Sequence, residues 1–511
     1  MFIFFCCTHG SLAEKCDAHS VCMAFAVPYS CRGGGAPLTC EGVVLYNTVS
    51  KQTTVVRNRG LFMYRNAEND MISWFSSSRR KPLVLRGARQ VGKSTLVRQF
   101  AATQKLVLNE INIERHLNLA KIFRSLDIPR ILEELSVLVG RSVDEPDSLL
   151  FLDEIQAVPE ALVALRYLYE DRPDLPVVAE GSLLEFALDA KRLSMPVGRV
   201  TYMYLGPMGF DEFLREVEPD LVAYCRQAAI ERSVPEMAHE RLKRRLRQFM
   251  FVGGMPEAVL AYSQEGLTAM SEVQRMILES YEDDFAKYAH GIDLALMQEI
   301  FRNLASQACK KVKYVNFSRE VGSREVKAVL NLFRKARVCA DVRASKCDGL
   351  PLYAETEEGA WKCLFMDVGL MIRSCGVVWQ MLERMDDIRF VNEGTLAEQF
   401  VGQHLLYASG CLEKPRLAYW LREGGKNNAE VDFVLAHEGE ILPIEVKAGA
   451  AGSLKSLREL ILAKRFPRAI RFDLNRPTSQ VVPLTTDAGT VTYTLDSLPL
   501  YAVPFLKTEG A

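Results

Sequence analysis

The pattern G-x-x-x-x-G-K-[ST], whose residue types suit phosphate binding, is complete at Gly87, Gly92, Lys93 and Ser94. The apolar run 83–85 before the pattern is typical of a buried strand, and residues 95–102 after it have helical periodicity. In such a loop, glycines let backbone N–H groups face the phosphates, and the start of the helix adds positive partial charge. We expect Lys93 to reach the β- and γ-phosphates and the Ser94 hydroxyl to ligate Mg²⁺. The pattern therefore predicts that the chain binds a nucleoside triphosphate such as ATP.

Two acids follow a second apolar run. Residues 148–152 are typical of a buried strand, and Asp153 and Glu154 come directly after them. A P-loop fold holds Mg²⁺ through water with an acid at the carboxyl end of a neighbouring strand, a place that suits Asp153. The adjacent Glu154 is placed to orient and deprotonate the attacking water. The pair favours hydrolysis over binding alone.

A third apolar run, residues 175–179, ends at Glu180-Gly181-Ser182, where a polar side chain could sense the γ-phosphate. Further along, Arg199 could stabilise transition-state charge, either in cis or from a neighbouring subunit. The alternative for Arg199 is an ordinary solvated surface arginine. The expected catalytic residues are thus Glu154, Lys93 and Arg199.

Several segments together resemble a prokaryotic family of AAA-type ATPases that carries a C-terminal domain of unknown function related to restriction-endonuclease folds. They are GARQVGKSTLVRQF, FLDEIQAVP, VVAEGSLLEFAL, PVGRVTYMYLGPMGFDEFL, VGGMPEAV and PIEVKAG. The resemblance runs from about Met63 to about Leu460, and the segments occur in the family's order.

The resemblance implies roles for individual residues. Asp153 is implied to be the metal-associated acid, Glu154 the catalytic base, Ser182 the sensor and Arg199 the family's arginine. Family members usually have Thr where this chain has Glu180; a carboxylate there would repel the γ-phosphate, so we expect Glu180 to point away. The implied ATP loop comprises Gly87, Ala88, Arg89, Gln90, Val91, Gly92, Lys93, Ser94 and Thr95.

The composition is that of a large globular protein. The 511 residues suggest about three or four domains, and 49% hydrophobic with 25% charged residues are globular averages. No apolar run approaches the length of a membrane-spanning helix. The formal net charge of −1 confines any nucleic-acid surface to a local patch.

Six of the 13 cysteines fall in the first 40 residues, ahead of the family resemblance. The spacing of Cys16, His19 and Cys22 is not that of a common zinc finger. We expect residues 1–62 to be a disordered tail or an extension from a misplaced start codon. The other cysteines are isolated, which fits a reduced, cytoplasmic protein.

The middle of the chain predicts a helical lid and then a DNA-binding segment. Residues 211–290 have long amphipathic helical stretches. Residues 302–346 hold 12 Lys or Arg against three acids. The sequence predicts helices at 316–321 and 324–335, the second capped by Ser323, followed by extended runs at 338–343 and 352–355. This order of elements is that of a winged helix. Its phosphate-contacting residues would be Arg324, Lys327 and Arg334; the alternative is a protein-docking module.

The last domain contains a second set of reactive residues. Asp432 lies in an alternating strand, and Glu445 and Lys447 share one face of the next. Asp432 and Glu445 could hold Mg²⁺ while Lys447 activates a water for attack on a phosphodiester. Glu398, on the upstream helix 393–406, would be an extra acid. This domain is either an active nuclease or a scaffold that has lost cleavage.

These observations predict an α/β multidomain protein. It comprises an N-terminal extension (1–62), a P-loop AAA-type core with a parallel sheet (63–210), a helical lid (211–290), a winged-helix segment (291–378) and a restriction-endonuclease-like αβ domain (385–511). Its expected cofactors are ATP and Mg²⁺, and its expected partners are DNA and further copies of the chain. The function is an ATPase that processes DNA or, alternatively, an ATP-dependent switch with an inactive nuclease-like domain.

Overall fold

The computed structural model describes residues 63–181, 198–288, 292–377, 393–423, 428–448, 453–486 and 489–506, together with three strands nearer the N-terminus. Those strands belong to a separate unit, Met1–Met63, and form an antiparallel sheet in the order β1-β2-β3. Their bounds are β1 (Cys22–Ser30), β2 (Thr39–Asn47) and β3 (Thr53–Val56). The expectation that residues 1–62 are disordered or an extra extension stays a prediction.

The second unit, Tyr64–Ala511, begins with a five-stranded parallel sheet in the order β5-β6-β7-β4-β8. Its strands are β4 (Leu83–Arg86), β5 (Val107–Asn112), β6 (Ser148–Asp153), β7 (Val177–Glu180) and β8 (Thr201–Tyr204). The central strands are buried because helices cover both faces of a parallel sheet. The strand order reverses next to β4, where an open α/β sheet leaves a crevice for a ligand.

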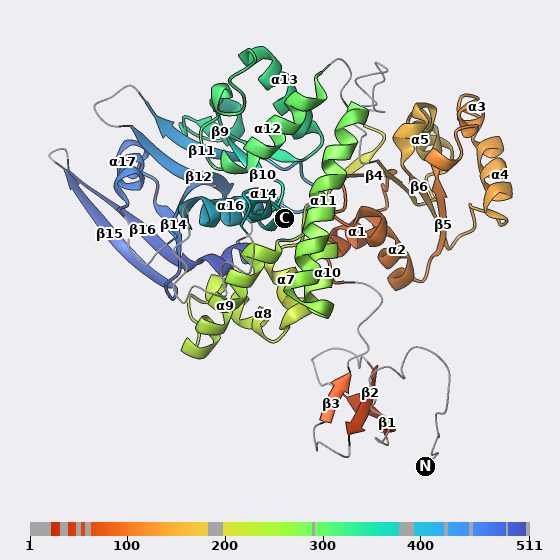
Figure 1. Ribbon diagram of the computed structural model, residues 1–511, viewed down its shortest axis with the longest axis horizontal. Coiled ribbons are helices and arrows are strands. Elements are labelled where there is room, and N and C mark those ends of the chain that lie inside the picture. The colour runs from red at the N-terminus through yellow and green to blue at the C-terminus, as the bar shows by residue number, and fades with distance from the viewer. Residues whose placement is uncertain are drawn as a thin grey trace. The chain divides into compact units, whose positions relative to one another are not determined.

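Helices surround this sheet (Figure 1). They are α1 (Ala67–Phe75), α2 (Lys93–Gln104), α3 (Leu119–Phe123), α4 (Ile128–Val139) and α5 (Pro159–Asp171). The start and end of α4 follow local rules: the Asp127 side chain accepts from the Arg130 N–H (3.3 Å), and Gly140 closes the helix in the left-handed region. Leu150 and Leu152 of β6 pack with α4 and α5 in one core cluster.

The residues predicted to form a helical lid do form helices. They are α7 (Phe210–Val217), α8 (Leu221–Ile230), α9 (Glu236–Val252), α10 (Pro256–Glu265) and α11 (Leu267–Tyr288). Gly253, between α9 and α10, has a positive φ, and a Cβ at this position would lie 2.1 Å from the Asp367 side chain. This glycine is therefore required by both the backbone turn and the close packing.

The next segment differs from the predicted winged helix. Its helices are α12 (Leu294–Ser306), the 3-10 turn η4 (Tyr314–Asn316), α13 (Ser323–Lys335) and α14 (Val368–Ser374). The predicted helix 316–321 is not formed, and Gly322 precedes α13 in place of a Ser323 cap. Residues 352–355 form a 3-10 turn, η5 (Leu352–Glu355), and the strand follows it. A winged helix is not confirmed.

The two strands of that segment extend the sheet of the C-terminal domain. β9 (Cys339–Ser345) pairs with β10 (Thr356–Phe365) on one side and, in parallel, with β11 (Leu417–Arg422) on the other. The pairing of β9 with β11 therefore crosses the predicted domain boundary at 378–385. The predicted wing is thus part of a larger sheet.

That sheet has eight strands in the order β10-β9-β11-β12-β13-β14-β16-β15. Its remaining elements are α16 (Glu393–Leu405), β12 (Ala429–His437), β13 (Glu440–Val446), α17 (Lys455–Lys464), β14 (Arg468–Asp473), β15 (Thr478–Thr486), β16 (Gly489–Pro499) and η6 (Leu500–Phe505). The predicted hairpin of β12 and β13 is found, followed by the predicted helix and strand. Within the described residues, no helix is both long enough and apolar enough to cross a membrane.

Candidate nucleotide site and carboxylate cluster

The P-loop runs from the end of β4 to the start of α2, as the sequence predicts. Gly92 has φ 86° and precedes the first residue of α2, so that Lys93 and Ser94 open the helix. At Gly87 a Cβ would lie 2.3 Å from the Leu205 carbonyl oxygen, which leaves room only for glycine. The loop therefore has the backbone shape that a phosphate cradle needs.

Glu180 points into this loop, contrary to the expectation that it points away. One carboxylate oxygen lies 3.4 Å from the Lys93 ammonium, and the other accepts a hydrogen bond from the Ser94 hydroxyl at 2.9 Å. Lys93 also donates to the Ala88 carbonyl (3.0 Å). The physical reason is charge: a buried ammonium is costly unless it is paired, and the Glu180 carboxylate is the anion that pairs with Lys93. Burial raises the pKa of Glu180, although Lys93 lowers it.

Asp153 and Glu154 lie at the end of β6, as predicted. Asp153 accepts a hydrogen bond from the Asn112 amide at the end of β5 (3.2 Å), and burial together with Glu154 raises the pKa of Asp153. Glu154 has φ 50°, an uncommon backbone conformation for glutamate, and accepts a hydrogen bond from the Gln156 side chain. The sequence analysis did not predict that Asn112 and Gln156 contact these acids. Asn112 could have been found, because it is a polar residue at the end of the strand that precedes β6 in the chain.

A further contact to the loop comes from α11. Asp284 is buried and forms an ion pair with Arg89, and the Tyr281 hydroxyl donates to the Arg89 carbonyl at 2.8 Å. Asp284 was not among the residues predicted to contact the nucleotide loop. Helical periodicity from Phe285 and Tyr281 could have placed Asp284 on the buried face.

Arg199 lies away from the nucleotide loop. It precedes β8, so it is at the amino ends of the parallel strands, whereas the loop follows the carboxyl end of β4. The Arg199 side chain is 43% exposed and forms an ion pair with Glu170 at 2.8 Å. This position does not favour a role in cis, and the catalytic role of Arg199, in cis or in trans, stays a prediction. Ser182 lies outside the described residues.

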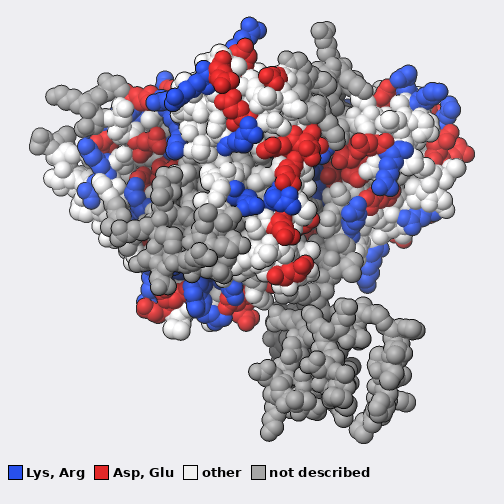
Figure 2. Space-filling view, in the orientation of Figure 1, with Lys and Arg blue, Asp and Glu red and all other residues white. Residues whose placement is uncertain are grey.

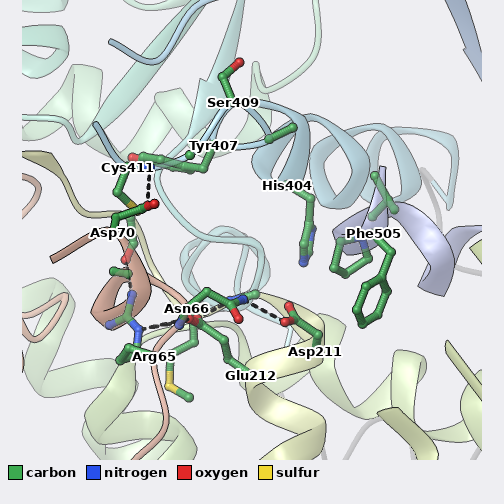
Figure 3. Close-up of a pocket in the computed structure, with 18 of the residues that line it drawn as sticks. Arg65, Asn66, Asp70, Asp211, Glu212, His404, Tyr407, Ser409, Cys411 and Phe505 are labelled. Carbon is green, nitrogen blue, oxygen red and sulfur yellow. Dashed lines mark hydrogen bonds and ion pairs between the residues drawn. The ribbon is translucent and has the colours of Figure 1, made fainter. Parts of the chain in front are cut away.

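A cavity of about 730 Å³ is lined by residues of α1, α7, α8, the end of α16 with the loop after it, and η6. Figure 3 shows Arg65, Asp211, Glu212 and His404 around it. Arg65 is buried, donates to the Val91 carbonyl of the P-loop (2.7 Å) and the Gly206 carbonyl (2.8 Å), and pairs with Glu212 at 3.3 Å. Arg65 thus ties the back of the loop to the helical region.

His404 of α16 joins the C-terminal domain to α7 at this cavity. Its Nε2 accepts from the Phe210 N–H (2.8 Å), so its Nδ1 carries the proton that is donated to the Phe400 carbonyl (2.7 Å). Burial lowers the pKa of His404 to about 4. The imidazole is therefore neutral in the folded protein.

The predicted nuclease residues converge in the C-terminal domain, but a lysine occupies their centre. The ammonium of Lys362, on β10, lies 2.8 Å from Glu398, 2.5 Å from Glu430 and 4.0 Å from Asp432. Lys362 is 1% exposed and also lies over the Tyr419 ring, 5.0 Å from its centre. Burial lowers the pKa of Lys362, but the surrounding carboxylates outweigh that effect and raise it, so the lysine stays charged.

The other two predicted nuclease residues pair with each other. Lys447 lies 2.5 Å from Glu445, and Asp432 accepts a hydrogen bond from the Val446 N–H at 2.7 Å. Burial and Asp432 raise the pKa of Glu445 to about 7, and burial raises that of Glu398 to about 8. In the described part of the chain, no group of three or more His, Cys, Asp or Glu side chains is arranged to hold a metal ion.

The three residues expected to contact DNA phosphates differ in their surroundings. Arg324 and Lys327 are exposed on α13. Arg334, near the end of α13, pairs with Asp341 of β9 at 2.7 Å and lies over the Trp361 ring. Only the first two present charge on an open helix face.

Comparisons with known families divide the chain into three matched segments. Residues 79–214 match the model of an AAA domain. Residues 243–379 and 393–491 match two domains of unknown function, DUF8612 and DUF4143. No curated protein matches the sequence. A restriction-endonuclease-like C-terminal domain is not confirmed by these matches.

Solved structures with some likeness are AAA-type and related ATPases. RuvB of Thermotoga maritima (T158V variant) is 18% identical with a TM-score of 0.23 and covers 46% of this chain and 85% of its own. The signal-transduction ATPase PH0952 of Pyrococcus horikoshii is 13% identical with a TM-score of 0.24, and the match covers 68% of this chain and 46% of PH0952. PCH-2 of C. elegans is 14% identical with a TM-score of 0.23, and the match covers 44% of this chain and 70% of PCH-2. These TM-scores are too low to carry an argument. From the family match and the parallel sheet, residues 79–214 are an AAA-type P-loop ATPase domain, and two domains of unknown function follow it.

Proposed function

We propose that the protein binds ATP at the loop Gly87–Thr95 and hydrolyses it. The observation that carries this proposal is the shared edge of one parallel sheet. The loop follows the carboxyl end of β4, and Asp153 and Glu154 stand at the carboxyl end of β6, with β7 between these two strands in the sheet. In an open α/β sheet this edge is where ligands bind.

The residues present fit ATP and Mg²⁺. The loop conformation leaves backbone N–H groups to face phosphates, and Ser94 and Asp153 would hold Mg²⁺, which neutralises charge on the phosphates when bound. Lys93 is released to meet the β- and γ-phosphates when Glu180 gives way. Glu154 orients the attacking water and takes its proton.

Nucleotide binding is tested by Lys93→Ala. The change removes the ammonium that meets the phosphates, so titration with a fluorescent ATP analogue should give no saturable binding. Lys121→Ala removes the same charge at an exposed position of α3, elsewhere in the domain, and this variant should bind like the wild type. Equal affinity of the Lys93→Ala variant and the wild type would refute the ATP site.

We further propose that the ATPase acts with DNA and that its C-terminal domain binds without cutting. The local excess of basic residues over 302–346 supports the first part. Lys362 supports the second, because its ammonium lies among Glu398, Glu430 and Asp432, where a nuclease would need a divalent cation. The nuclease roles of Asp432, Glu445 and Lys447 are the competing proposal.

Cleavage assays decide between these two proposals. Supercoiled plasmid and single-stranded DNA are incubated with the wild type, with Mg²⁺ or Mn²⁺, and with or without ATP. We expect no nicking in any arm. Nicking that is lost in both Asp432→Ala and Lys447→Ala, while ATP hydrolysis persists, would establish the nuclease and overturn the binding proposal.

We propose a cytoplasmic location, because the seven cysteines from Cys225 to Cys411 carry free thiols, as expected in a reducing compartment. We also propose that copies of the chain assemble if Arg199 acts on a neighbour's nucleotide. Analytical ultracentrifugation with and without ATP tests this: a monomer under both conditions contradicts a role for Arg199 in trans.

A further inference from the structure

We propose that a single strand of nucleic acid binds in a basic pocket that the ATPase sheet, the end of α13 and the loop before β11 form together. The pocket deepens the nucleic-acid part of the proposed function and rests on it. Its volume is about 520 Å³, and seven of its 13 lining residues are Lys or Arg, against one Asp. The chain as a whole is nearly neutral, with 63 basic and 64 acidic residues. Figure 2 shows both signs interspersed over the visible face, so this one-sided charge is local.

Three arginines of the pocket lie over tyrosine rings. The distances from Cζ to the ring centres are Arg86 over Tyr202 (4.1 Å), Arg337 over Tyr204 (5.2 Å) and Arg416 over Tyr353 (6.0 Å). A neutral ring holds a guanidinium plane without cancelling its charge. The charges of Arg337 and Arg416 can therefore still attract phosphates, and a flat guanidinium is also a surface on which unpaired bases stack.

Two further arginines share one carboxylate. Asp341 lies 2.7 Å from Arg334 and 2.6 Å from Arg343. Burial raises the pKa of Asp341, but the two arginines outweigh it and hold that pKa below its ordinary value, so the acid stays charged. Two cations on one anion keep a positive excess and fix both guanidinium groups in place, which lowers the entropy cost of binding a phosphate.

The size of the pocket favours a single strand. Its volume is in the range of sites that enclose a small ligand, which suits one or a few nucleotides. A duplex instead receives a helix in its major groove, which is about 12 Å wide, and the basic residues here line a recess rather than a projecting helix. Arg324 and Lys327, which do project from α13, are not among the lining residues.

The pocket also adjoins the nucleotide loop. Arg86 is the last residue of β4, and Gly87 follows it directly. A strand bound at Arg86 therefore contacts the element that positions the P-loop. We expect nucleic acid to change the rate of ATP hydrolysis through this contact.

The test uses the full chain without ATP, so that its outcome is independent of hydrolysis. Binding of a fluorescein-labelled oligothymidylate of about 16 nucleotides is measured by anisotropy over a range of salt concentrations. The pocket variant is Arg337→Glu with Arg416→Glu. The matched control is Lys121→Glu with Arg130→Glu, which reverses the same number of charges at exposed positions of α3 and α4, outside the pocket.

We expect the pocket variant to bind at least about tenfold more weakly, with a log–log salt slope shallower by about 0.7 for each lost phosphate contact, and the control to bind within about twofold of the wild type. An oligouridylate of the same length and a duplex are parallel arms, which separate DNA from RNA and one strand from two. If the charge reversals unfold the protein, Arg337→Gln with Arg416→Gln replaces them.

Three results would overturn the proposal: no binding of any strand by the wild type, equal loss in pocket and control variants, or tighter binding of duplex than of either single strand. A wild type that binds the strand through this pocket but hydrolyses no ATP would leave the pocket standing and sink the ATPase proposal instead.

Discussion

Replacing Glu180 with Gln should tighten ATP binding. The carboxylate of Glu180 contacts both groups of the loop that must meet phosphate and metal, the Lys93 ammonium at 3.4 Å and the Ser94 hydroxyl at 2.9 Å. ATP can use Lys93 only after this carboxylate moves, and the moved carboxylate still faces the added negative charge of the γ-phosphate. Glutamine keeps the size of the side chain and removes the charge.

The size of the effect follows from the contacts that are lost. A hydrogen bond to a charged group contributes about 1.5–3 kcal/mol, and the Glu180 carboxylate gives up such a contact when ATP binds. Glutamine at this position keeps only a neutral hydrogen bond, which contributes about 1 kcal/mol. The difference of roughly 0.5–2 kcal/mol corresponds to a Kd for ATP lower by a factor of about 2 to 30.

The assay is titration with a fluorescent ATP analogue in EDTA, which removes any contribution of Glu180 to metal binding. Glu160→Gln is the matched control, because Glu160 pairs with Arg124 on the surface of the same domain at 2.7 Å. We expect the control to bind like the wild type. Weaker ATP binding by Glu180→Gln would show that the carboxylate helps to hold the nucleotide, and the reasoning from charge competition would be refuted.

Three further predictions concern buried contacts. Asp284→Asn breaks the ion pair with Arg89 and should weaken ATP binding roughly tenfold, which corresponds to a loss of about 1.5 kcal/mol. The control Glu279→Gln, on the same helix, should leave the affinity for ATP unchanged. Equal affinities of the two variants would contradict the role of Asp284. Lys362→Met leaves buried carboxylates without their cation and should lower the free energy of unfolding, measured in urea, by about 3–5 kcal/mol. The control is Lys311→Met, which removes a half-buried lysine from a surface ion pair and should cost less than about 1 kcal/mol. Similar losses for the two variants would contradict the role of Lys362 as the cation of this cluster. His404 has its folded pKa depressed to about 4, so the unfolded chain binds the extra proton and stability falls as pH drops from about 6.5 toward 4, by about 1.4 kcal/mol per unit. The stability of His404→Gln should therefore fall less than that of the wild type over this pH range, measured by urea unfolding at each pH. Identical dependence of stability on pH for the variant and the wild type would show that the loss in acid does not come from His404.

The sequence was sufficient for the parts of the fold that local patterns encode. The strand and helix around Gly92 and Lys93, the strand ending at Asp153 and the hairpin of β12 and β13 all follow from apolar periodicity and loop chemistry. The helices of 211–290 follow for the same reason.

The errors concern contacts between distant segments. Lys362 and Asp432 are 70 positions apart, and only the pairing of β9 with β11 brings their strands into one sheet. The direction of Glu180 depends on the charge of Lys93, which no pattern within β7 reveals. Arg199 was proposed from its charge and from the family resemblance, and neither reveals that the parallel direction of β8 puts it at the opposite edge from the loop.

The central claim is ATP hydrolysis at the edge formed by β4 and β6. Its most direct test is steady-state phosphate release with Mg²⁺ and ATP, measured for the wild type and for Glu154→Gln, with nucleotide binding of both proteins determined in parallel. We expect turnover by the wild type, and for Glu154→Gln unchanged ATP binding with a rate lower by about 10²–10⁴, the usual contribution of a general base. Equal rates of phosphate release for the two proteins, or no release by a wild type that binds ATP, would contradict the account.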